Sequence, residues 1–111
     1  MVPEIDIERV RRWAATRVPV HLQDKIRIEV EVSDRAITIL ECHPPWSPQV
    51  GPEWSRLQVA RLRYTKKRNE WSLYWSDRNS DFHVYDLVEP STDIADLIAE
   101  IEADPTCIFW G

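Results

Sequence analysis

The period of the hydrophobic residues changes twice along this chain, and these changes limit the folds that it can adopt. Apolar side chains recur every three to four positions over residues 4–17, which predicts an amphipathic helix that ends before Pro19. Its apolar stripe consists of Ile7, Val10, Trp13 and Ala14. Helical spacing returns after the capping sequence Ser91-Thr92-Asp93 and stops at Asp104-Pro105. The sequence therefore predicts one helix near each end.

Between these helices the period is close to two, which is typical of strands. Short polar stretches separate the strands, as antiparallel hairpins require. The predicted strands cover residues 25–32, 36–42, 57–64, 71–75 and 82–87. This order predicts an α+β fold: a five-stranded antiparallel meander flanked by an N-terminal and a C-terminal helix packed on one face. The length of 111 residues fits a single domain over residues 1–111.

Several classes of protein are not expected from this composition. No apolar run approaches about 20 residues, so no membrane span is predicted. The first residues lack the basic start and apolar stretch of a signal peptide, and two cysteines are too few for a disulfide framework. We therefore expect a cytoplasmic protein. Neither a C-x-x-C nor an H-x-x-x-H pattern occurs, and Gly51 and Gly111 are the only glycines, so neither a metal nor a cofactor is predicted.

Alternation along the last three predicted strands indicates which side chains face away from the helices. Those expected to face the core are Leu62, Tyr64, Trp71, Leu73, Trp75, Phe82 and Val84. Those expected on the opposite face are Arg61, Arg63, Tyr74, His83 and Tyr85. Tyrosine rings and guanidinium planes on a sheet stack on bases, and guanidinium groups bind phosphates. A histidine beside arginines can also act as a general acid or base in metal-independent RNA cleavage.

A purely structural interpretation of the same residues stays open. Cross-strand arginine, tyrosine and histidine pairs stabilise an exposed sheet by a few tenths of a kcal/mol each. The charge distribution bears on both interpretations, because residues 55–78 carry seven basic and two acidic side chains. No Lys or Arg follows Arg78, whereas eight carboxylates do, within a net charge of −5. The basic middle therefore either meets an anionic partner or is a solvated surface.

A second candidate site is the proline-rich loop over residues 44–54. It holds four of the eight prolines and two of the six tryptophans, Trp46 and Trp54. Proline restricts its own backbone and that of the residue before it, so this loop is expected to be stiff. Its rings then either cover an edge of the core or bind a protein partner.

The chain resembles an uncharacterised bacterial family, domain of unknown function 3024, over nearly its whole length. Two of the matching motifs are Glu41-Cys42-His43-Pro44-Pro45-Trp46 and Trp71-Ser72-Leu73-Tyr74-Trp75. The other matching stretches are residues 10–13, 17–22, 51–54, 60–66, 77–79, 83–86 and 104–111. The resemblance implies a bacterial cytosolic protein, and it supplies no activity, cofactor or catalytic residue.

Three functions are compatible with these features. The leading hypothesis is a non-catalytic binding module that uses the proline-rich loop or the sheet face, because no catalytic set is recognisable. The first alternative is binding or cleavage of single-stranded RNA by the sheet face. The second is a homo-oligomeric structural protein in which the apolar terminus around Phe109 and Trp110 docks onto another copy.

Overall fold

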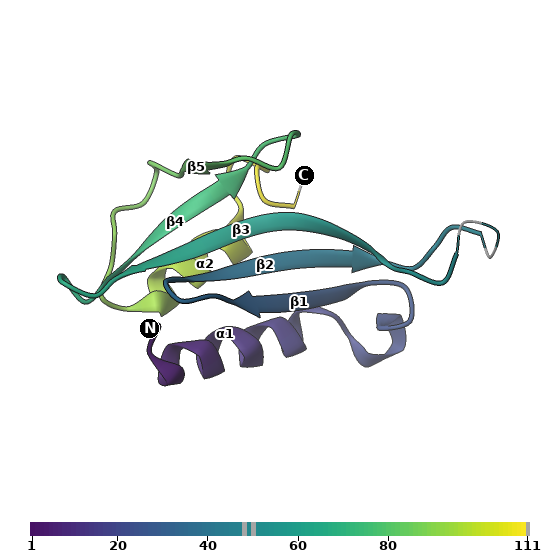
Figure 1. The fold of residues 1–111 in the computed structure, drawn as a ribbon, viewed down its shortest axis with the longest axis horizontal. Helices are drawn as coiled ribbons and strands as arrows, with labels where there is room; N and C mark the ends of the chain where they lie inside the picture. The colour runs from purple at the N-terminus through teal and green to yellow at the C-terminus, as the bar shows by residue number, and fades with distance from the viewer. Residues whose placement is uncertain (48, 50, 111) are drawn as a thin grey trace.

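The computed structural model describes residues 1–47, 49 and 51–110. Its helices are α1 (Glu4–Arg17), the short 3₁₀ helix η1 (Val20–Leu22) and α2 (Ile94–Ala103). Its strands are β1 (Arg27–Val32), β2 (Ala36–His43), β3 (Ser55–Thr65), β4 (Glu70–Ser76) and β5 (Phe82–Val84). The strands lie in the sheet in chain order, each antiparallel to its neighbours (Figure 1). The predicted α+β meander is thereby confirmed.

Both long helices cover the same face of the sheet. In the view of Figure 1, α1 runs along β1 and α2 lies behind the strands. The apolar stripe of each helix faces the sheet, so Val10 of α1 and Leu97 of α2 are fully buried with Leu62 of β3. No helix of residues 1–47, 49 and 51–110 lies on the opposite face of the sheet. None of the helices in the described part of the chain is both long and apolar enough to cross a membrane.

A β-bulge in β3 changes which of its side chains reach the uncovered face. The pairing shifts between Ile39 and Leu40 of β2, so Val59 is an extra residue between two paired positions. After the bulge Arg61 and Arg63 point to the uncovered face, whereas before it Arg56 does so. Period alone does not reveal a single inserted residue, so the sequence did not predict this feature.

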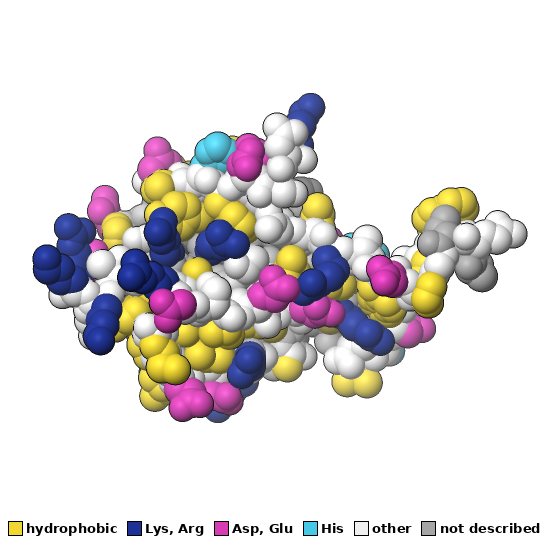
Figure 2. Space-filling view, in the orientation of Figure 1, with side chains coloured by type: hydrophobic (Ala, Val, Ile, Leu, Met, Phe, Trp, Pro, Cys, Tyr) yellow, Lys and Arg dark blue, Asp and Glu magenta, His cyan; other side chains and the backbone are white. Residues whose placement is uncertain are grey.

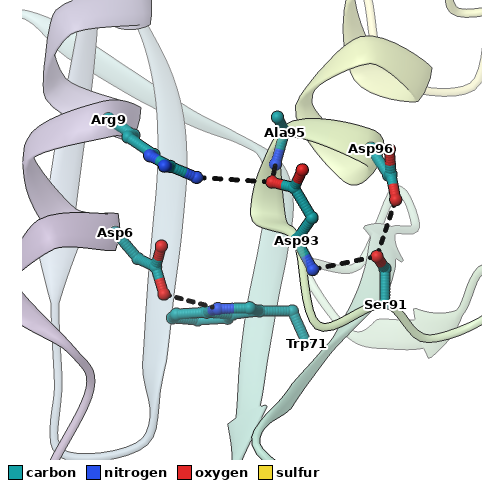
Figure 3. Close-up of polar contacts among 7 residues, drawn as sticks. All are labelled: Asp6, Arg9, Trp71, Ser91, Asp93, Ala95 and Asp96. Atoms are coloured by element: carbon teal, nitrogen blue, oxygen red, sulfur yellow. Dashed lines mark hydrogen bonds and ion pairs between the residues drawn. The ribbon is translucent and has the colours of Figure 1, made fainter.

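A polar network joins α1 to β4 and to the start of α2 (Figure 3). The buried indole of Trp71 donates to Asp6 Oδ2 at 3.0 Å, and Arg9 binds Asp93 at 3.3 Å. Within the predicted capping sequence Ser91-Thr92-Asp93, the N-cap is Asp93, whose side chain accepts from the backbone N–H of Ala95 at 3.0 Å. These bonds fix the two helices on one sheet face, and this leaves the other face open.

The apolar C-terminus packs on its own chain. Phe109 is 6% exposed with its ring centroid 5.0 Å from that of Tyr85, and Trp110 Nε1 donates to the carbonyl of Ile101 at 2.8 Å. The side chain of Phe109 is therefore not available to a second copy.

Candidate nucleic-acid interface

The register of the central strands places three of the predicted residues on the uncovered face. Arg61 lies opposite Thr38 on one side and Tyr74 on the other, and Arg63 lies opposite Ser72. The alternate residues Leu62 and Leu73 are buried against the helices. Arg61, Arg63 and Tyr74 thus lie side by side, away from the helices, as predicted.

The predicted orientations in the fifth strand are wrong. Ser76 pairs with Phe82 and Tyr74 with Val84, so Phe82 and Val84 share the uncovered face with Tyr74. His83 pairs with Trp75 on the helix side, and Tyr85 is only 4% exposed. The cause is the turn over residues 77–81, which sets a pairing one residue away from the one expected. His83 and Tyr85 therefore do not belong to the same surface as the arginines.

Two neighbours hold the side chain of Arg61 in place. Its Nε donates to Thr38 Oγ1 at 3.0 Å, and its guanidinium carbon lies 4.2 Å from the centroid of the Phe82 ring. Phe82 is thus a packing partner for a cation instead of a core residue. Neither Arg61 nor Arg63 makes an ion pair within residues 1–47, 49 and 51–110. Their positive charge is therefore available to an anionic ligand.

The uncovered face is hollowed around these arginines. Two adjoining depressions, of about 570 and 650 Å³, share Arg35, Arg63 and Tyr74 as lining residues. We call their combined surface the basic groove, and its charged side chains are Arg35, Arg61, Arg63, Lys66, Lys67, Asp34 and Asp81. Figure 2 shows Lys and Arg side chains gathered on this face toward the β3–β4 hairpin. Five cations against two carboxylates make the groove positive in a chain whose net charge is −5.

The sequence prediction missed Arg35 as part of this surface. Arg35 lies in the β1–β2 turn, and its carbonyl accepts from the backbone N–H of Tyr64 at 2.8 Å. This hydrogen bond brings the turn beside Arg63, which is 28 residues away in the chain. Lys66 and Lys67 belong to the basic stretch noted in the sequence, but only the β3–β4 hairpin brings them to the groove.

Ion pairs limit the groove toward the other end of the sheet. Arg56 Nη2 lies 2.6 Å from Glu31 Oε2 and 3.2 Å from Glu29 Oε1. Two carboxylates on one guanidinium leave that part of the face without excess positive charge. The cations of the basic groove therefore lie in the half of the face nearer the β3–β4 hairpin, whereas Arg27 at the other end is stacked on the ring of Trp54.

His83 takes part in a local pair on the edge of the sheet. Its Nε2 lies 2.7 Å from Asp77 Oδ2, and its ring centroid lies 4.8 Å from that of Trp75. Asp77 also accepts from the backbone N–H groups of Asn79 and Asp81, so these bonds, led by that with His83, hold the pKa of Asp77 below its usual range. RNA cleavage by the predicted set would require His83 to lie beside Arg61 and Arg63. The structure places His83 on the other face of the sheet from these arginines.

The two tryptophans of the proline-rich loop differ in their surroundings. Trp46 is 86% exposed, whereas the ring of Trp54 is half-buried with the guanidinium carbon of Arg27 4.0 Å from its centroid. Pro48 and Val50 of this loop lie outside the described residues. Trp54 is therefore engaged within the chain, while Trp46 is presented to solvent.

The potential metal ligands do not gather in the described part of the chain. No group of three or more His, Cys, Asp or Glu side chains that could hold an ion occurs there. Cys42 is fully buried, and burial is the main cause that raises the pKa of its thiol, followed by the charge of Glu29. The thiol is therefore favoured over the thiolate that metals bind.

Residues 2–111 match the family described as Domain of unknown function (DUF3024). The chain belongs to the DUF3024 family. No curated protein and no solved structure matches it. The surface of this DUF3024 protein is therefore the basis on which its function is proposed.

Proposed function

We propose that this DUF3024 protein is a non-catalytic binding module that takes single-stranded RNA in the basic groove. The observation that carries the proposal is the arrangement of Arg61 and Arg63 around Tyr74 on a sheet face without a covering helix. Residues two apart on a strand are separated by about 7 Å, so the two guanidinium groups reach separate points of an extended backbone. An aromatic ring beside cations is an arrangement with which many proteins bind single strands.

The charge distribution of the whole chain supports an anionic ligand on this face. Seven basic residues over 55–78 are followed by eight carboxylates, and several of these lie on or beside α2 on the other face of the sheet. The groove attracts an approaching polyanion, and the carboxylates of α2 and its capping residues disfavour its contact with that part of the helix layer.

The proposal includes a cytoplasmic location. Cys42 and Cys107 are both free, which is in keeping with a reducing compartment. Protein binding through the exposed Trp46 stays a prediction.

Fluorescence anisotropy with a labelled uridine-rich RNA of ten nucleotides tests the proposal. Tyr74→Ala is expected to weaken binding at least fivefold without changing its salt dependence, because a stacked base contributes about 1–3 kcal/mol. Arg63→Ala is expected to weaken binding and to reduce the slope of log affinity against log salt by about 0.7, the value for one phosphate contact.

Arg11→Ala is the matched control for Arg63→Ala. Arg11 is exposed on α1, on the helix side of the sheet, and makes no ion pair with any residue that the structure describes. Equal losses of affinity in Arg11→Ala and Arg63→Ala would show that RNA affinity depends on the net charge of the protein and not on the basic groove. Binding that does not change with salt would contradict the proposal.

A further inference from the structure

A second groove lies in the helix layer, between α1 and α2, and it has an apolar floor. Its volume is about 550 Å³, and we call it the helix groove. The floor consists of Trp13, Ala95, Ile98 and Ala99. Trp13 and Ile98 are only half-buried, and both alanines are exposed, so this apolar surface is open to solvent.

The two walls of the helix groove carry charges of opposite sign. Arg9 and Arg12 line it from α1, and Glu102 lines it from α2. One end is spanned by the bond from Arg9 to Asp93 (Figure 3). Arg12 makes no ion pair among the described residues. One wall thus holds a free cation above an apolar floor.

The carboxylate on the other wall has an unused oxygen. Trp13 Nε1 and Arg17 Nη1 approach Glu102 at 3.2 and 3.3 Å, and both reach its Oε2. Oε1 has no such partner in the described part of the chain. Arg12 and Glu102 therefore offer complementary groups that are not paired with each other within one molecule.

We propose that the helix groove binds the helix groove of a second copy of this chain in a two-fold dimer. A two-fold axis along the groove places α1 of each copy over α2 of the other, so Arg12 of one copy meets Glu102 of the other twice. The small side chains Ala95 and Ala99, one helical turn apart, allow the partner helix to approach closely. The apolar stripe extends to Ile5, which is 66% exposed and lies one turn before Arg9.

This dimer is independent of RNA binding, because the helix groove and the basic groove lie on opposite sides of the sheet. In the dimer the helix layers meet and the two basic grooves face outward. The dimer would then present two RNA-binding surfaces, which raises the avidity for a strand long enough to reach both.

Sedimentation velocity of the full chain between about 1 and 100 µM, the range in which a micromolar dimer dissociates, tests the proposal. We expect the wild-type chain to form a dimer. Arg12→Glu should raise its dissociation constant at least tenfold, because two carboxylates would then face each other at each of the two contacts. Arg11→Glu is the matched control, since it makes the same charge change one residue away, outside the groove, and should leave the dimer intact.

A charge exchange gives a second, positive test. Arg12→Glu and Glu102→Arg should each be monomeric alone, but an equimolar mixture should form a heterodimer in which one contact joins two unlike introduced charges and the other joins the two native ones. If circular dichroism shows that Glu102→Arg does not fold, the proposal is tested by comparing the dimer dissociation constants of Arg12→Glu and Arg11→Glu. A wild-type chain that stays monomeric at the highest concentration, or equal dimerisation of these two variants, would overturn the proposal.

Discussion

Tyr85 has a buried hydroxyl whose partner is a carboxylate. Its Oη donates to Glu100 Oε2 at 2.6 Å, and its ring packs against Phe109. Burial, followed by the bond and charge of Glu100, raises the pKa of Tyr85 from 10.0 to about 12. The folded state therefore favours the neutral phenol more strongly than the unfolded state does.

This difference predicts how stability changes at high pH. Because the folded pKa of Tyr85 is the higher one, its contribution is fully present below pH 10 and is lost as pH rises toward 12. In urea unfolding at neutral pH, the free energy of unfolding of the wild type should exceed that of Tyr85→Phe by about 1–3 kcal/mol, because the hydroxyl donates a hydrogen bond to a charged group. The advantage should shrink from pH 10 upward. A constant difference between the two proteins up to pH 12 would show that the phenol ionises freely in the fold.

At the scale of one element, Asp104 both ends α2 and folds back the C-terminal segment. Its backbone is left-handed, with φ of 42°, and its N–H donates to the carbonyl of Glu100 at 2.9 Å. Its side chain accepts from the backbone N–H of Phe109 at 3.1 Å and from that of Trp110 at 2.9 Å. One residue thus connects the end of the helix to the aromatic cluster of the core.

Two substitutions at this position separate its roles. Asp104→Gly removes both side-chain hydrogen bonds, but glycine adopts the left-handed backbone without strain. We therefore expect the free energy of unfolding to fall by about 2 kcal/mol. Asp104→Ala should lose about 1 kcal/mol more, because a Cβ is unfavourable at this φ. Urea unfolding followed by tryptophan fluorescence measures both values. A fully stable Asp104→Gly protein would mean that the terminus is held by apolar packing alone.

The elements differed in how well the sequence predicted them. The first helix lies at Glu4–Arg17 as predicted, because its apolar spacing and Pro19 act together. The fifth strand was placed one residue out of phase and ends at Val84, before the predicted residue 87. Phe82 and Tyr85 are both aromatic, so alternation gives no preference for either face. The Asp77 side chain, which accepts from two backbone N–H groups of the turn, fixes the phase instead.

In the candidate site, too, the sequence predicted side-chain orientation correctly in some strands and not in others. Arg61, Arg63 and Tyr74 were predicted correctly on the uncovered face, since their strand neighbours Leu62 and Leu73 are strongly apolar. His83 and Tyr85 were predicted wrongly on that face, because β5 is only three residues long, ends before Tyr85 and follows a five-residue turn over residues 77–81. Arg35 could not be predicted, since only the register of β2 against β3 brings it to Arg63.

At the scale of the whole molecule, the basic groove and the acidic region around α2 lie on opposite sides of one sheet. The uncovered side holds the basic groove, and α2 with its two capping residues Asp93 and Asp104 holds five of the eight carboxylates that follow Arg78. A chain with net charge −5 can therefore still bind a polyanion on one side. We propose that the basic groove, and not the helix layer or the proline-rich loop, contacts RNA.

An NMR titration of the isotope-labelled protein with a short uridine-rich RNA in low salt tests this claim most directly. We predict shifts that cluster on Arg61, Arg63 and Tyr74 and on their neighbours in the β3–β4 hairpin, with α1 and α2 unchanged. These shifts should disappear as salt is raised, because phosphate contacts are screened. No shifts in low salt, or shifts confined to the helices or to Trp46, would contradict it.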